Sequence, residues 1–132
     1  MKLGVICDGI SRDLAHSLNV MDEFGLEYAE LQFVGDKEVG DHSKTEIKEI
    51  DTLLRDRGKP VSCLSRHIFA GMTSQNKPGD ELHLKHMDAL KRVVEMAHIV
   101  GSPFVRIMTQ KKEQILWGFN GAEKWNVAHG AW

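Results

Sequence analysis

The longest regular pattern of apolar residues in this chain lies between Asp80 and Thr109. Apolar side chains recur there at three- and four-residue steps, which predicts one face of an amphipathic helix. The predicted face consists of Met87, Leu90, Val93, Val94, Ala97 and Val100. Gly101 stands where a left-handed helix cap is expected, and Pro103 prevents the helix from resuming. Residues 104–108 (Phe-Val-Arg-Ile-Met) then predict a short strand whose only charge is Arg106.

Three further strands, alternating with two helices, are predicted before this unit. The strands are expected at residues 3–7, 28–34 and 61–65. Ser11 is predicted to cap the first helix, and Ser43 with Glu46 forms a capping-box signature for the second. Polar loops are expected at 35–42 and 66–79. This alternation is typical of parallel strands joined by right-handed helical crossovers.

The long loops follow strands, whereas the helix-to-strand turns are short. In α/β folds the loops after the strands gather at the carboxyl edge of the sheet, where ligands bind. We therefore expect the functional edge to carry Asp8, the 35–42 loop, His67 and the residues after Met108.

The polar residues within the strands favour a barrel over an open doubly wound sheet. Central strands of a doubly wound sheet are covered on both faces and consist of continuous apolar residues. The strand at 28–34 instead places Tyr28, Glu30 and Gln32 on one face, and the strand at 104–108 carries Arg106. A barrel interior accommodates such residues near its mouth. We predict a partial TIM barrel, with about four βα units of a (β/α)₈ barrel.

The organisation of the chain follows from that prediction. Residues 1–132 are interpreted as a single domain, the N-terminal half of such a barrel, and residues 122–132 are expected to begin a fourth helix. A different interpretation is a small α/β binding or oligomerisation module without catalysis, which buries its open strand edge against a second copy. A homo-oligomer is therefore a possible assembly.

Composition excludes several classes of protein. The 132 residues are 42% hydrophobic and 27% charged, and the formal net charge of −2 with no long basic run does not predict a nucleic-acid partner. Neither a signal peptide nor a membrane-spanning stretch is predicted. Cys7 and Cys63 both fall in predicted strands, which favours reduced thiols and a cytoplasmic protein. Nucleotide-binding glycine motifs and zinc-hydrolase motifs do not occur.

Three segments carry a resemblance to a known family. They are residues 25–32 (Gly-Leu-Glu-Tyr-Ala-Glu-Leu-Gln), 58–64 (Gly-Lys-Pro-Val-Ser-Cys-Leu) and 101–106 (Gly-Ser-Pro-Phe-Val-Arg). In this order and spacing they resemble the second, third and fourth strands of the xylose isomerase-like TIM barrel family. That family comprises sugar and sugar-phosphate isomerases and epimerases, and it also includes the endonuclease IV type of AP endonuclease.

The resemblance implies an enzyme of sugar metabolism whose substrate is a small sugar or sugar phosphate. It implies metal-dependent aldose–ketose isomerisation or epimerisation in the intact enzyme, with a divalent metal (Mn, Mg, Co or Zn) held at the ends of strands five to eight. No residue of this chain matches those positions, so no catalytic residue and no metal ligand are assigned, and this half is expected to be inactive alone. His67 is similar in position to a zinc-binding histidine of the endonuclease branch. The second histidine of that branch has no counterpart after Arg106.

Four side chains are therefore predicted to contact a substrate: Asp8, Glu30, His67 and Arg106. A structural alternative is that Glu30 and Arg106 pair inside the barrel, in which case removing either one would cost several kcal/mol. Arg106 alternatively binds an anionic or hydroxyl-rich substrate, because its planar guanidinium suits carboxylate and phosphate. His83 and His86 are three residues apart on a predicted helix. They either bind one metal ion together or lie on the helix surface without a ligand.

Overall fold

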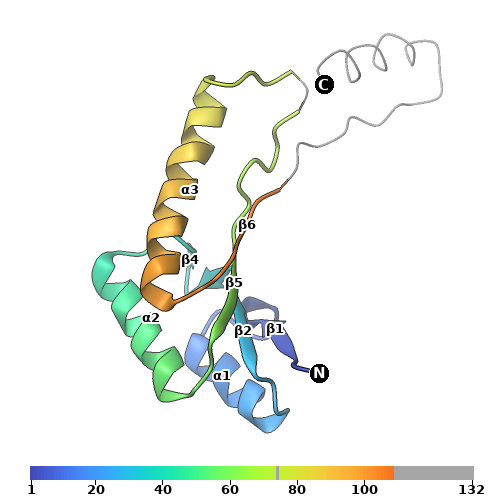
Figure 1. Ribbon diagram of the computed structural model, residues 1–132, viewed down its shortest axis with the longest axis vertical. Coiled ribbons are helices and arrows are strands. Elements are labelled where there is room, and N and C mark those ends of the chain that lie inside the picture. The colour runs from blue at the N-terminus through green and yellow to red at the C-terminus, as the bar shows by residue number, and fades with distance from the viewer. Residues whose placement is uncertain (74, 109–132) are drawn as a thin grey trace, which may run out of the picture.

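The central sheet has four parallel strands, and three helices pack on it (Figure 1). The computed structural model describes residues 1–73 and 75–108. The strands lie in the order β1 (Gly4–Ile6), β2 (Tyr28–Leu31), β5 (Val61–Ser65) and β6 (Val105–Arg106). The helices are α1 (Leu14–Glu23), α2 (Lys44–Asp56) and α3 (Glu81–Val100). A short turn, η1 (Cys7–Gly9), follows β1, and an antiparallel hairpin, β3 (Phe33–Val34) and β4 (Lys37–Glu38), follows β2. These elements form a small α/β domain.

The strand order is the feature that distinguishes this sheet from a doubly wound one. Each strand of the sheet pairs with the one that follows it, and the order does not reverse within residues 1–108. A doubly wound sheet reverses its order at a switch point, which places helices on both faces. Here α1 contacts α2 and α2 contacts α3. All the helices therefore cover a single face of the sheet.

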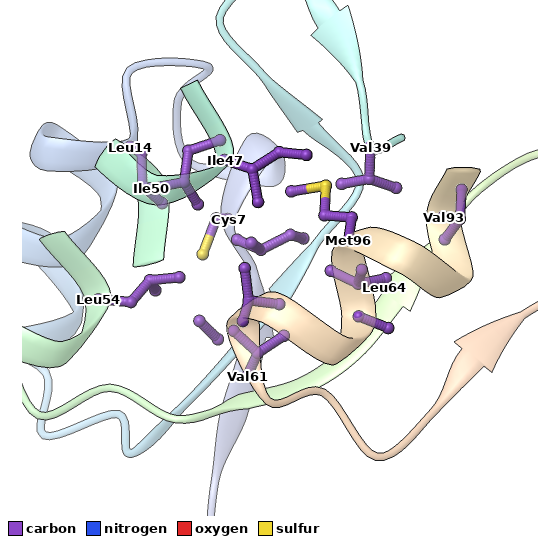
Figure 2. Close-up of a cluster of buried hydrophobic side chains, with 14 of the residues drawn as sticks. Cys7, Leu14, Val39, Ile47, Ile50, Leu54, Val61, Leu64, Val93 and Met96 are labelled. Carbon is purple, nitrogen blue, oxygen red and sulfur yellow. The ribbon is translucent and has the colours of Figure 1, made fainter. Parts of the chain in front are cut away.

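The core fills the space between the helices and that face (Figure 2). On the strands it uses alternate positions, as expected for a half-buried strand: Ala29 and Leu31 of β2 are fully buried, whereas Tyr28 and Glu30 are only partly buried. Side chains from all three helices complete one cluster, among them Leu18, Met21, Ile47, Leu54, Val93 and Met96. One continuous core thus ties every helix to β2 and β5.

Helix caps confirm the predictions for two helices and correct the third. Ser43 and Glu46 form the predicted capping box at α2, and Gly101 ends α3 with a positive φ of 69°. The prediction that Ser11 caps α1 is wrong. The cap is Asp13, whose carboxylate accepts the His16 amide, while the Ser11 hydroxyl accepts the amide of Asp13 itself. Both residues are good capping types, so their order alone does not decide between them.

The buried face of α3 is turned slightly from the predicted one. Val93, Ala97 and Val100 are buried as predicted, but Val94 is 39% exposed. Ala89 and Met96 are buried in its place. Val94 lies one residue, or about 100°, around the helix from Val93, so only one of these two neighbours can face the sheet.

The segment after β2 differs most from expectation. The predicted strand at 28–34 stops at Leu31, and the predicted loop at 35–42 contains β4, which pairs back onto β3. β6 is shorter than predicted, and Phe104, Ile107 and Met108 are exposed. Thr109 and the predicted helix start at 122–132 lie outside the described residues. In the part of the chain that the structure describes, no helix combines the length and apolar character needed to cross a membrane.

Candidate functional site

The sheet face opposite the helices carries most of the predicted site. Glu30 lies in register with Ile6 of β1 and Cys63 of β5, and Ser65 lies in register with Arg106 of β6. Partners across a strand pair project to the same side of a sheet. Glu30, Cys63, Ser65 and Arg106 therefore share one face, which we call the open face. Within the described residues, no helix covers it.

Glu30 has a nearer partner than the one predicted from the sequence. The Ser65 hydroxyl donates a hydrogen bond to Glu30 Oε1, and Ser65 is completely buried. Arg106 Nη1 lies 4.0 Å from the same oxygen, at the outer limit of an ion pair. The side chains of Arg106 and Glu30 are 36% and 26% exposed. The predicted Glu30–Arg106 pair is thus present but loose, so we expect removal of one partner to cost less than the several kcal/mol predicted for a tight buried pair.

Arg106 retains hydrogen-bonding capacity that no described residue uses. Its Nε atom is buried and has no hydrogen-bond partner among the described residues. A guanidinium donates five N–H groups, and a loose contact with Glu30 leaves most of them free. The arrangement can bind an additional acceptor, such as a hydroxyl, carboxylate or phosphate oxygen.

Asp8 lies at the same carboxyl edge, in the turn η1 directly after β1. Its Oδ1 atom is buried and has no partner within the described part of the chain. Burial raises the pKa of the neighbouring Cys7 thiol to about 11, and the negative charges of Asp8 and Glu30 add to the effect. Both carboxylates therefore lie near the end of β1, and Cys7 remains a protonated thiol at neutral pH.

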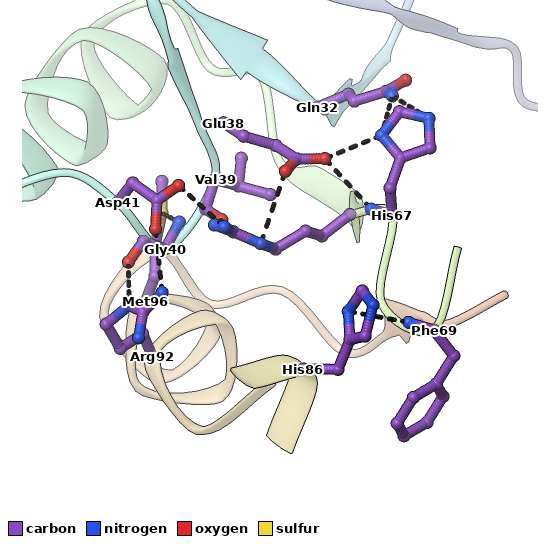
Figure 3. Close-up of polar contacts among 11 residues, drawn as sticks. Gln32, Glu38, Val39, Gly40, Asp41, His67, Phe69, His86, Arg92 and Met96 are labelled. Atoms are coloured by element: carbon purple, nitrogen blue, oxygen red, sulfur yellow. Dashed lines mark hydrogen bonds and ion pairs between the residues drawn. The ribbon is translucent and has the colours of Figure 1, made fainter. Parts of the chain in front are cut away.

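His67, at the end of β5, is held by a residue that the sequence analysis did not single out (Figure 3). Glu38 Oε1 accepts the backbone amide of His67 at 3.0 Å and lies 2.8 Å from its Nδ1. Gln32, just after β2, places its amide nitrogen 3.1 Å from His67 Nε2 and 3.2 Å from Nδ1. The histidine side chain remains 47% exposed. It is thus oriented by two neighbours yet accessible to a ligand.

Two arginines fix the segment that delivers Glu38 (Figure 3). Arg66 donates to the Val39 carbonyl at 2.5 Å and to Asp41 at 2.7 Å. Arg92 of α3 reaches Asp41 at 3.1 Å. Burial opposes ionisation of Asp41, but the hydrogen bonds from both arginines outweigh it and hold its pKa below the usual range.

Gly40 is required where this segment crosses α3. Its φ of 88° favours glycine, and a Cβ atom there would lie 2.7 Å from Cγ2 of Val93. The missing side chain therefore lets the backbone after β4 pass directly against α3. This close approach keeps the hairpin, and with it Glu38, next to the end of β5.

His83 and His86 are not arranged as metal ligands. His83 Nδ1 accepts the Gly79 amide at 3.1 Å, and His86 Nδ1 accepts the Phe69 amide at 3.1 Å. Each neutral ring then carries its proton on Nε2, which removes that lone pair from metal binding. Both side chains instead hold the 66–79 loop against the start of α3. Phe69, whose φ is 64°, packs between them.

Sequence reasoning missed Glu38 and Ser65 for different reasons. Ser65 ends a predicted strand, and a small hydroxyl residue there gives no signal of its own. The position of Glu38 could have been inferred from a turn pattern in the sequence. Gly35-Asp36, between Val34 and Lys37, is typical of a two-residue hairpin turn with glycine first. Gly35 has the φ of 63° that such a turn needs. A hairpin at this position predicts that Glu38 is held near the sheet.

The described residues do not form a metal centre. No three His, Cys, Asp or Glu side chains among them are grouped so that they could hold a metal ion. The family resemblance places the metal of the intact enzyme on strands five to eight, so the described residues do not test that expectation. Comparison with models of known protein families finds no match, and comparison with curated protein sequences finds none either.

Proposed function

We propose that this chain forms the N-terminal half of a (β/α)₈ barrel enzyme that isomerises or epimerises a sugar or sugar phosphate. In this proposal the open face is part of the barrel interior. Its carboxyl edge, with Asp8, Glu30, His67 and Arg106, is one wall of the substrate pocket. The intact enzyme would be similar to members of the xylose isomerase-like family.

The arrangement of the sheet supports a barrel. A barrel needs parallel strands in sequential order with every helix on the outer face. The four strands of the sheet are parallel and sequential, and the helices share one face. Four such strands are half of the eight that close a barrel of this type.

The chemistry of the open face is the observation that carries the function. Glu30, Ser65 and Arg106 meet there, and Arg106 Nε has no partner among the described residues. An inward sheet face would normally be apolar if it served only to pack another layer. Carboxylate, hydroxyl and guanidinium groups instead suit a ligand rich in hydroxyl and phosphate oxygens.

In this proposal the described residues bind the substrate rather than complete its conversion. The family resemblance places the metal ligands and the acid–base carboxylates on strands five to eight. No step of the proposal therefore runs through a metal held by residues 1–108. The half-barrel should bind a sugar phosphate weakly and should not interconvert it.

Titration calorimetry with D-fructose 6-phosphate tests the proposal. We expect millimolar binding to the wild-type chain, and an affinity at least about tenfold lower for Arg106→Met, because the phosphate or hydroxyl oxygens lose a charged donor. Arg55→Met is the matched control, since Arg55 is exposed on α2 and, among the described residues, forms an ion pair only with Asp51. Equal binding by all three proteins would contradict a sugar site at Arg106.

A second candidate function is an oligomerisation module. The observation that favours it is the group of exposed apolar side chains beside β6, namely Phe104, Ile107 and Met108. The outer edges of β1 and β6 have no strand partner among the described residues, and an open edge favours pairing with another strand. Light scattering distinguishes the two: a stable dimer that does not bind the sugar phosphate would favour the module.

A further inference from the structure

We propose that Glu38 fixes His67 in the tautomer that turns an unprotonated Nε2 toward the substrate, so that His67 accepts a proton from a substrate hydroxyl. Glu38 is the positioning residue, and His67 is the residue that touches the substrate. The role toward a sugar rests on the proposed function, whereas the tautomer rests on geometry alone.

The carboxylate of Glu38 is placed to select the tautomer. Its Oε1 accepts both the backbone amide and the Nδ1–H of His67, at 3.0 and 2.8 Å. Its Oε2 lies 3.4 Å from Arg66 Nε, so the carboxylate sits beside a fixed positive charge. The Glu38 side chain is only 17% exposed, which limits competition from water. A carboxylate that accepts from Nδ1 leaves the lone pair of a neutral imidazole on Nε2.

Gln32 occupies the place that a substrate hydroxyl would take. Its amide nitrogen lies 3.1 Å from Nε2 and 3.2 Å from Nδ1. With Nδ1 donating to Glu38, Nε2 is the ring nitrogen that can accept the amide hydrogen. A hydroxyl group is also a donor, so it can replace the amide without leaving the lone pair unsatisfied. Nε2 is therefore ready to accept a hydrogen bond from the open side of the sheet.

His67 lies one step nearer the pocket mouth than the Glu30–Arg106 group. It comes two residues after Ser65, the last residue of β5, and Gln32 comes directly after Leu31, the last residue of β2. Two residues of extended chain span at most about 6.6 Å. A small sugar that contacts Arg106, which pairs with Ser65, can span that distance to reach His67.

The proton transfer is a simple acid–base step. The hydroxyl proton moves to Nε2 while its bonding pair stays on oxygen, which gives a substrate alkoxide and an imidazolium. The negative charge of Glu38 stabilises that imidazolium, as a carboxylate does in other carboxylate–histidine pairs. The same proton returns from Nε2 to a substrate oxygen, so the histidine is regenerated.

Glu38 is not needed to hold its own hairpin in place. Arg66 binds the Val39 carbonyl and Asp41, and Arg92 binds Asp41 and the Gly40 carbonyl at 3.2 Å. None of these contacts involves the Glu38 side chain, so we expect them to remain in a Glu38 variant. A variant at Glu38 therefore tests the histidine rather than the folding of the hairpin.

The experiment is a ¹⁵N spectrum of the histidine rings at a pH where imidazoles are neutral. We expect His67 of the wild-type chain to carry its proton on Nδ1. In Glu38→Ala the proton should move to Nε2, the tautomer that an unconstrained imidazole favours. Asp36→Ala is the control in the same hairpin, because Asp36 is exposed, and it should leave His67 unchanged. An Nε2-protonated His67 in the wild-type chain would overturn the proposal.

Adding D-fructose 6-phosphate to the same samples separates this proposal from the proposed function. Selective shifts of His67 Nε2 and of the Arg106 side chain, with the Nε2 shift lost in Glu38→Ala, support both. Shifts at Arg106 with none at His67 overturn the role of His67 but leave the sugar site standing. Shifts at neither residue overturn the sugar site, and the proton-transfer role falls with it.

Discussion

The two faces of the sheet are built from neighbouring residues but serve opposite purposes. On β5, Leu64 is fully buried beneath the helices, whereas Cys63 and Ser65 beside it project from the open face. On β2, Ala29 and Leu31 enter the core, whereas Glu30 binds the Ser65 hydroxyl. Apolar burial on one face supplies stability, and this leaves the other face free to carry charged and polar groups.

Hydrogen bonding and partial exposure explain why this short sheet can carry charged side chains on its open face. A buried carboxylate is costly unless it is hydrogen-bonded, and Glu30 has both Ser65 and a nearby Arg106. Its 26% exposure reduces that cost further. Arg106 Nε on the open face and Asp8 Oδ1 at its carboxyl edge are buried without a hydrogen-bond partner among the described residues. Both atoms could therefore form a hydrogen bond with a ligand.

The largest expected difference between the faces is in thiol reactivity. Cys7 is 1% exposed beneath α1, and burial raises its pKa to about 11, while Cys63 is partly exposed on the open face. Cys7 should react with a disulfide reagent at least about a thousandfold more slowly than Cys63, because it must wait for the protein to open. Cys63→Ser assigns the fast phase. Equally fast reaction of the two thiols would contradict the difference in burial.

The second prediction compares adjacent residues of β5. Leu64→Ala should lower the free energy of unfolding by about 2–5 kcal/mol, because it leaves a cavity in the core. Cys63→Ala, which removes one atom from the open face, should cost less than about 1 kcal/mol. Urea denaturation measures both. A larger loss for Cys63→Ala would mean that the open face is packed against another part of the protein.

The third prediction concerns the serine that binds Glu30. Ser65→Ala should cost about 1–3 kcal/mol, because it removes the hydroxyl that donates to a partly buried carboxylate. Ser62→Ala on the same strand is the control, since the Ser62 hydroxyl donates to the uncharged Ala29 carbonyl rather than to a carboxylate. We expect it to cost about 1 kcal/mol or less. A neutral Ser65→Ala would show that water replaces the hydroxyl.

The smallest expected effect is the coupling between Glu30 and Arg106. A 4.0 Å separation and an Arg106 side chain 36% exposed predict an interaction below about 1 kcal/mol. A double-mutant cycle with Glu30→Gln and Arg106→Met measures it. A coupling of several kcal/mol would restore the tight structural pair expected from the sequence, and it would leave Arg106 unavailable for a ligand.

Local signals in the sequence predicted most elements of this fold. The capping box at Ser43, the stop at Gly101 and the alternation at 28–31 each depend on neighbouring residues, and each is confirmed. The carboxyl edge was predicted as well, because it follows from the parallel order of the strands. Features that depend on contacts between distant residues could not be predicted. For example, whether Val93 or Val94 faces the sheet depends on how α3 packs against it.

The candidate site could likewise be predicted only in part from the sequence. Glu30 and Arg106 were recognisable as charges within strands. The contact of Glu38 with His67 was not, because 29 residues separate the two and only the folded hairpin brings them together. Ser65 is similarly 35 residues from Glu30. Residue type identified the candidates, but only the fold identified their partners.

Binding of a sugar phosphate to the open face can be tested by mapping backbone amide shifts. D-fructose 6-phosphate is added to the ¹⁵N-labelled chain, and every assigned amide is followed. We expect the shifts to concentrate at the carboxyl edge of the open face, around Glu30, Ser65, His67 and Arg106. Shifts confined to the helices, or no shifts at millimolar sugar phosphate, would contradict it.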